Sequence, residues 1–160
     1  MKRTIIILCA GLIGLMHPTA SHAALDFTFS FTNTFGSVNG TVTGEIFGLV
    51  NGTAVPATNV ILTSYPAGLL LPAPPLNAFT SVDEHLFNVS SDEITRVNFE
   101  GSNIPLFSLG LETFGASGLS PDLFLISGAG PNLAVRSDQF PSFSLIAPPV
   151  PRWRGRKAPA

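Results

Sequence analysis

Alternating apolar and polar residues mark the first predicted strand of the chain. From Leu25 to Thr32 (LDFTFSFT) every second residue is apolar. Successive side chains on a strand project to opposite faces, so this spacing predicts a strand over residues 25–32 with one buried face. The residues from Asn33 to Gly36 then supply a turn.

The same two-residue period continues in the next segment, where glycine interrupts it. The segment from Val38 to Leu49 (VNGTVTGEIFGL) places three glycines on the face that carries Val42 and Ile46. Glycine inside a strand marks a bulge or the close approach of another chain segment, and we interpret these glycines as packing positions rather than as a ligand site. The pair Asn51-Gly52 is a turn of the kind that forms hairpins.

Short alternating or β-branched runs continue to the end of the domain. They lie at residues 58–65, 79–82, 85–89, 95–100, 107–111, 123–126, 133–136 and 143–145, with a proline-rich loop at 66–78 whose three leucines, residues 69–71, are expected to lie against the domain. The run from Leu123 to Ile126 has no polar residue, which predicts a strand covered on both faces. The frequent turns and the lack of a helical period predict an all-β fold over residues 24–146, either an antiparallel β-sandwich or a barrel-like domain.

The N-terminal residues have the three parts of an export signal. Lys2 and Arg3 precede an uncharged apolar run at residues 5–16, and a stretch of small residues follows. This order is typical of a cleaved secretory signal, whereas a membrane span needs roughly 20 apolar residues. We predict a signal peptide over residues 1–23 with cleavage between Ala23 and Ala24, and a secreted, periplasmic or cell-surface location.

Removal of this leader would leave few reactive side chains. Cys9, His17 and His22 all lie within it, so the mature chain would have no thiol and would keep His85 as its one imidazole. Such a chain has no disulfide, thiolate metal site or multi-histidine zinc site of its own. We predict no catalytic residue, no cofactor and no metal site, and therefore a protein that is not an enzyme.

Acidic residues dominate the predicted domain. All 10 lie between Asp26 and Asp138, a span with only two basic residues, Arg96 and Arg136. Because such a surface repels phosphate groups, we expect no nucleic-acid partner. Calcium remains open, since several carboxylates lie near predicted turns although no D-x-D-x-D-G loop is present. These carboxylates belong to Asp83, Glu84, Asp92, Glu93 and Asp122.

His85 follows two carboxylates, which is an arrangement that suits a general base. On a regular strand only Asp83 would share its face, and no nucleophile motif accompanies the pair. We therefore interpret His85 as a histidine at the surface or at the edge of the core.

Two aromatic residues are candidate contacts for a ligand. Flat carbohydrate platforms favour large rings with a polar group, and the domain offers only Tyr65, while Trp153 lies in the C-terminal segment. That segment, residues 147–160 (APPVPRWRGRKAPA), is rich in proline and cations, which predicts a disordered basic tail without a stable membrane anchor.

Two internal segments and the leader follow a known pattern. The segments run from Gly40 to Leu49 (GTVTGEIFGL) and from Ala57 to Leu69 (ATNVILTSYPAGL). They resemble the PEP-CTERM group of exported bacterial proteins, which are substrates of exosortase sorting systems. Members end in Val-Pro-Glu-Pro, a hydrophobic span and an arginine cluster, but this chain has only Val150-Pro151 and the cations of residues 152–157. The resemblance implies an exported protein of the cell surface or exopolysaccharide matrix, with a degenerate or missing sorting signal.

These observations together favour an exported, non-enzymatic structural or interaction protein of the cell surface or exopolysaccharide matrix. Its expected partners are exopolysaccharide or other matrix components. A carbohydrate-binding module is the main alternative, and Tyr65 is the residue that would carry it. A hydrolase with an unfamiliar carboxylate site, built on Asp83 and His85, is the remaining alternative.

Overall fold

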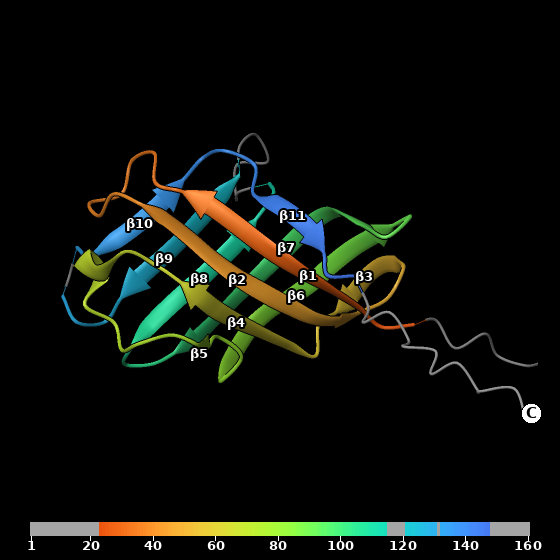
Figure 1. Ribbon diagram of the computed structural model, residues 1–160, viewed down its shortest axis with the longest axis horizontal. Helices are drawn as coiled ribbons and strands as arrows, with labels where there is room; N and C mark the ends of the chain where they lie inside the picture. Colours follow the sequence, from red (N-terminus) through yellow and green to blue (C-terminus); the bar gives the residue numbers. More distant parts are fainter. Residues whose placement is uncertain (1–22, 115–120, 131, 148–160) are drawn as a thin grey trace, which may run out of the picture.

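The chain folds as two antiparallel β-sheets that pack face to face. The computed structural model describes residues 23–114, 121–130 and 132–147, and Figure 1 shows the strands of the front sheet crossing those of the sheet behind. This confirms the all-β prediction and selects the sandwich over the barrel-like alternative. Within these described ranges, no helix is both long enough and apolar enough to cross a membrane.

The front sheet has five strands in the order β11-β1-β2-β4-β5. Strand β1 has the bounds that the alternation predicts, and its three phenylalanines are buried. The strands of this sheet are β1 (Leu25–Thr32), β2 (Thr41–Leu49), β4 (Asn59–Ser64), β5 (Leu76–Asn77) and β11 (Ser142–Leu145).

The second sheet has six strands in the order β10-β9-β8-β7-β6-β3. Strand β3 was not predicted, and β6 joins two runs that the sequence analysis separates, with a register shift between Val82 and Glu84. The strands are β3 (Gly52–Pro56), β6 (Ser81–Ser90), β7 (Glu93–Asn103), β8 (Phe107–Glu112), β9 (Asp122–Ser127) and β10 (Ala134–Ser137).

The core lies between the inner faces of the two sheets. Phe87 and Phe99, on neighbouring strands, have ring centroids 6.2 Å apart, and Phe79 stacks on Phe99 at the same distance. Burial of each large apolar side chain contributes about 1.5–3 kcal/mol. The largest fully buried side chains are Phe27, Phe29, Phe87, Phe99, Ile46, Leu49, Leu62, Leu69, Leu109, Leu111, Leu123 and Leu125.

The loop between β1 and β2 covers the edge of the six-stranded sheet. The backbone N–H of Thr34 donates to the carbonyl of Arg136 at 2.7 Å, and that of Val38 donates to the carbonyl of Ala134 at 2.9 Å. The loop therefore satisfies backbone groups of the edge strand β10 that another chain would otherwise pair with.

Asn51-Gly52 does not form a hairpin, so that prediction was wrong. Strand β2 pairs with β4, whereas β3 pairs with β6 in the other sheet, and the chain crosses between the sheets at this point. The Asn51 amide donates to Asp92 at 2.7 Å and accepts the Asp92 N–H at 3.1 Å. A tight hairpin turn, at Ser91 and Asp92, instead joins β6 to β7 with φ values of 53° and 61°. A local turn preference indicates where the chain can turn, but it does not determine which strands pair with each other.

The glycines of β2 serve packing, as the sequence analysis interprets them. A Cβ atom on Gly44 would lie 2.3 Å from the ring of Phe29 and 2.3 Å from the carbonyl oxygen of Ile61. Gly48 has φ +73°, a conformation that other residues rarely adopt. Both positions therefore require glycine for reasons within the fold.

Strand β9 is not covered on both faces, and that prediction was also wrong. Leu123 and Leu125 are fully buried, but Phe124 and Ile126 lie half-buried on the outer face. Hydropathy does not distinguish the inner leucines from the outer phenylalanine and isoleucine, so the alternation is invisible in the sequence. The proline-rich loop includes the short helix η1 (Ala67–Leu69), in which Leu69 is buried, whereas Leu70 is 68% exposed.

Candidate functional site

The outer face of the six-stranded sheet carries a row of side chains that crosses five strands. The pairing register places Glu84 opposite Glu100, Glu100 opposite Gly110, Gly110 opposite Phe124 and Phe124 opposite Arg136. Strands lie about 4.8 Å apart, so the row spans roughly 19 Å. It brings together carboxylates, an aromatic ring and a guanidinium group from five separate parts of the chain.

The aromatic ring of this row lies over a glycine. Phe124 belongs to β9, and a Cβ atom on Gly110 of β8 would lie 2.2–2.7 Å from three atoms of its ring. The ring therefore occupies the space that any other residue at Gly110 would fill. This contact holds an apolar, planar group against the outer surface of the sheet.

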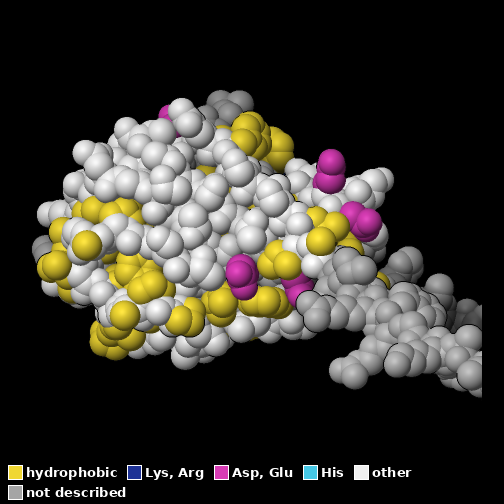
Figure 2. Space-filling model, in the orientation of Figure 1, with side chains coloured by type: hydrophobic (Ala, Val, Ile, Leu, Met, Phe, Trp, Pro, Cys, Tyr) yellow, Lys and Arg dark blue, Asp and Glu magenta, His cyan; other side chains and the backbone are white. Residues whose placement is uncertain are grey.

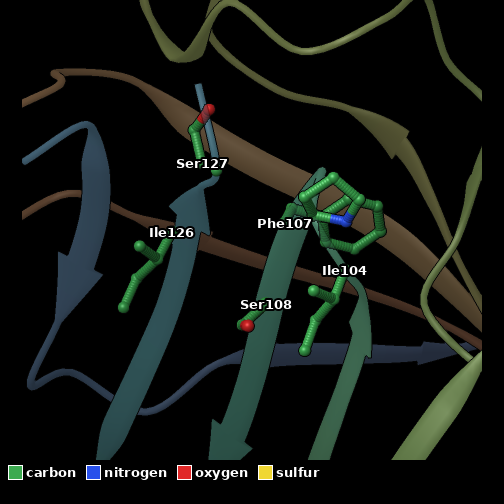
Figure 3. A pocket seen from close by; sticks show the side chains of 7 residues that line it. Ile104, Phe107, Ser108, Ile126 and Ser127 are labelled. Atoms are coloured by element: carbon green, nitrogen blue, oxygen red, sulfur yellow. The ribbon is translucent and has the colours of Figure 1, made fainter. Parts of the chain in front are cut away.

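A hollow of about 280 Å³ lies beside the row, where β8 has a small side chain. In Figure 3, Ile104, Ser108 and Ile126 project to one side of the strands, and Phe107 projects to the other. Ser108 is paired with Ser102, so two short hydroxyl side chains lie next to each other on this face. The hollow therefore has isoleucine walls and a hydroxyl group at Ser108.

Carboxylates of like charge lie directly opposite one another on this face. Glu84 is paired with Glu100, and Glu112 is paired with Asp122. Burial raises the pKa of Glu112, and the negative charges of Asp122, Glu84 and Glu100 raise it further. Like charges in directly opposed positions destabilise a sheet, so these side chains are not optimised for stability.

A second hollow, of about 250 Å³, lies on the same sheet near β3. Asn88, which lines it, accepts the Ala54 N–H at 2.8 Å. Arg96, also in its lining, extends along the sheet with its guanidinium carbon 5.3 Å from the centre of the Phe114 ring. Hydrogen-bonding groups therefore continue from the central row to the β3 edge.

The outer face of the five-stranded sheet is different in composition. Figure 2, which views this side, shows a broad surface of uncharged side chains and backbone, with patches of hydrophobic side chains and a few scattered acidic ones. Its threonines bond to one another: Thr32 to Thr41 at 2.8 Å, and Thr43 to Thr63 at 3.0 Å. These four threonines therefore have hydrogen-bond partners within the fold.

Tyr65, the predicted ligand contact, has a structural role in the fold. Its hydroxyl donates a hydrogen bond to the carbonyl of Pro72, which ties the proline-rich loop to the end of β4. The ring packs against the core, and burial raises the pKa of the phenol.

Trp153, the other predicted contact, lies outside the described residues, as do residues 1–22 of the predicted leader and 148–160 of the predicted tail. Ala23 and Ala24 are exposed and precede β1.

His85 lies at the edge of the core, in agreement with its interpretation from the sequence. The imidazole is half-buried and meets the ring of Phe79 edge-on at 6.0 Å. Strand β6 changes register between Val82 and Glu84, so simple alternation does not apply to Asp83.

The carboxylates considered for calcium do not gather at one point. Asp92 lies in the hairpin turn, where it bonds to Asn51, whereas Asp122 pairs with Glu112 across β8 and β9. Among the described residues, no three histidine, cysteine, aspartate or glutamate side chains are grouped in a way that would hold a metal ion.

Sequence reasoning missed Phe124, Gly110 and Glu100 as neighbours. Their contact depends on the register between β7, β8 and β9, which residue spacing does not determine. One signal was present: Gly110 interrupts the alternation in β8 at a position that faces outward, where glycine weakens a strand unless another group covers it.

Comparison with family models, curated proteins and solved structures finds no match to this chain.

Proposed function

We propose that the protein is an exported, non-enzymatic interaction protein of the cell surface or exopolysaccharide matrix. On this proposal the outer face of the six-stranded sheet is the surface that meets its partner. The export part of the proposal rests on the basic start, apolar run and small-residue site of residues 1–23. The matrix setting rests on the resemblance of residues 40–49 and 57–69 to the PEP-CTERM group, with the sorting signal degenerate or missing.

One observation carries the choice of surface. The paired carboxylates Glu84–Glu100 and Glu112–Asp122 oppose each other without a benefit to the fold. A protein with a purely structural role would be more stable with threonines at these four positions, as on the outer face of the five-stranded sheet. Side chains that lower stability are typical of surfaces that bind another molecule.

A carbohydrate-binding module is the second candidate function, and a specific contact favours it. The ring of Phe124 over Gly110 offers an apolar plane beside hydrogen-bonding carboxylates, which is what a sugar ring requires of a binding surface. This candidate no longer depends on Tyr65, because the hydroxyl of Tyr65 is engaged by Pro72.

The hydrolase alternative has weaker support. His85 packs against Phe79, and the bulge before Glu84 removes the geometric reason for pairing it with Asp83. If the alternative were correct, turnover on a hydrolase substrate panel would disappear in Asp83→Asn or His85→Ala. We expect no turnover in the parent chain or in either variant.

Export and matrix retention are tested with the full chain in a host that makes an exopolysaccharide matrix. We expect N-terminal sequencing of the extracellular protein to begin at Ala24, and cell fractionation to find the protein with the matrix. The double variant Glu84→Gln, Glu100→Gln should release it into the medium, whereas Glu45→Gln on the other sheet should not. Uncleaved protein in the cytoplasm would contradict export, and equal retention of all three proteins would contradict the proposed surface.

A further inference from the structure

The ring of Phe124 and the carboxylate of Glu100 lie on either side of the same glycine. Gly110 is paired with Glu100 on one flank and with Phe124 on the other, and the ring covers the position where a side chain would stand. An apolar plane and a hydrogen-bond acceptor are therefore fixed at one level of the sheet. A sugar ring has the complementary groups, since its C–H face is apolar and its edge carries hydroxyl donors.

The hollow at Ser108 extends this surface along the strands. Ile126 follows Phe124 on the outer face of β9, and Ser108 precedes Gly110 on the outer face of β8. Ile126 and Ser108 line the hollow of about 280 Å³, and Ile104 lines it as well, so the hollow begins one outward position along the strands from Phe124 and Gly110. A ligand that lies on Phe124 has room to continue over Ser108.

The charge on this face restricts the chemistry of the ligand. Four carboxylates lie on the outer face of the six-stranded sheet, against Arg96 and Arg136. The acidic residues are Glu84, Glu100, Glu112 and Asp122. A polymer with uronic-acid or sulfate groups would be repelled, whereas hydroxyl groups would donate to these acceptors.

We infer that the outer face of the six-stranded sheet binds a neutral, hydroxyl-rich polysaccharide, with Phe124 as the stacking surface and Glu100 as the principal hydroxyl acceptor. The inference rests on the proposed interaction function and names its ligand class. The row of about 19 Å from Glu84 to Arg136 accommodates several sugar units, so the site suits a chain rather than a single sugar.

Native gel electrophoresis through soluble polysaccharides tests the inference. The full chain, expressed with its own leader and purified from whichever fraction contains it, is run through dextran, a soluble β-glucan and a galactomannan, and through anionic alginate. We expect at least one neutral polymer to retard the protein and alginate to leave its mobility unchanged. If no neutral polymer retards the folded protein, the inference is wrong.

Matched variants locate the site. Phe124→Ala should weaken binding at least about tenfold because it removes the stacking surface. Glu100→Gln should weaken binding several-fold because it replaces a charged hydrogen-bond acceptor with a neutral, weaker one. Phe47→Ala and Glu45→Gln are the controls, since both residues lie on the outer face of the five-stranded sheet. Circular dichroism on each variant confirms folding. Equal effects of Phe124→Ala and Phe47→Ala would overturn the assignment.

The outcomes separate this inference from the proposed function. Binding of alginate that depends on Phe124 would overturn the neutral ligand class and leave the surface in place. Failure of every polysaccharide to bind, with matrix retention still lost in Glu84→Gln, Glu100→Gln, would overturn the ligand class alone. Retention that is unaffected in that double variant would contradict the proposed function itself.

Discussion

The two outer faces of the sandwich have the same strand geometry but differ in the chemistry of their side chains. On the five-stranded sheet the outward positions are mostly threonine and serine, and their hydroxyl groups bond across the strands, as in Thr32 to Thr41 and Thr43 to Thr63. On the six-stranded sheet the outward positions include opposed carboxylates and a ring that lies over Gly110.

The difference concerns how the side chains of each outer face contribute to the stability of the sheet. Cross-strand hydroxyl pairs stabilise a sheet, whereas like charges in the same relation destabilise it by a few tenths of a kcal/mol or more. Glu45 on the five-stranded sheet has Thr28 and Ile61 as its cross-strand neighbours, and no carboxylate faces it. The energetic conflict is therefore concentrated on the six-stranded sheet.

Two glycines that touch phenylalanine rings give the largest expected contrast. Gly44→Ala places a methyl group against Phe29 in the core and against the backbone of Ile61, and we expect it to lower the free energy of unfolding by about 2–3 kcal/mol. For Gly110→Ala the three nearest atoms all belong to the ring of Phe124, which lies on the outer face and can rotate away, so the expected loss is below about 1 kcal/mol. Urea denaturation measures both values.

Polysaccharide binding should show the opposite order for these two variants. Gly110→Ala displaces the ring and should weaken binding several-fold, while folded Gly44→Ala should bind as the parent does. If Gly110→Ala proved as destabilising as Gly44→Ala, the contact between Phe124 and Gly110 would stabilise the fold as much as a core contact does. The outer face of the six-stranded sheet would then serve the stability of the fold, and the two outer faces would not differ in this respect.

The repulsion between Glu112 and the neighbouring carboxylates predicts that Glu112→Gln stabilises the protein at neutral pH. The pKa of Glu112 is raised in the folded protein above its ordinary 4.5. The folded protein therefore binds a proton at this carboxyl group more tightly than the unfolded chain does. Stability is consequently lost as the pH rises from 4.5 through the raised value. Glu112→Gln removes this loss and should raise the melting temperature at pH 7 by about 1–3 °C.

The gain should shrink as the pH falls below 4.5, because the carboxyl group then becomes protonated in the unfolded state as well as in the folded state. Glu45→Gln is the matched control, and its melting temperature should follow that of the parent at both pH values. Thermal unfolding at pH 7 and pH 4 measures the difference. A lower melting temperature for Glu112→Gln at pH 7 would mean that the carboxylate stabilises the fold.

An effect smaller than that of Gly44→Ala is expected on the threonine face. Thr43→Val removes one partner of the 3.0 Å bond to Thr63 and should cost about 0.5–1 kcal/mol. The double variant Thr43→Val, Thr63→Val leaves no hydroxyl without a partner and should recover most of that loss. Neither variant should change polysaccharide binding. A loss of binding in either one would show that the ligand lies on the five-stranded sheet and not on the six-stranded sheet.

Local pattern was sufficient to predict the strands whose two faces differ in polarity. Strand β1 alternates phenylalanine with aspartate, threonine and serine, and its bounds agree with the prediction. Strand β9 has apolar side chains on both faces, so its outward Phe124 could not be distinguished from the buried leucines. Strand β3 lies at a sheet edge and has half-buried or exposed residues throughout, so it leaves little hydrophobic pattern to detect.

The candidate site could not be predicted because its parts come together only through register. Glu100, Gly110 and Phe124 are distant in sequence and meet through the pairing of β7, β8 and β9. Sequence reasoning selected Tyr65 on ring type alone, whereas its contact with Pro72 depends on how the proline-rich loop folds back. Asn51-Gly52 likewise had the composition of a hairpin but a position between two sheets.

Amide chemical shifts test most directly whether the six-stranded sheet is the binding face. The ¹⁵N-labelled chain is titrated with the neutral polysaccharide that retards it most in native gels. We expect the shift changes to concentrate on β7, β8 and β9, around Glu100, Gly110 and Phe124, while the amides of the threonine face keep their shifts. Changes concentrated on β1, β2 and β4, or no changes in any strand, would contradict it.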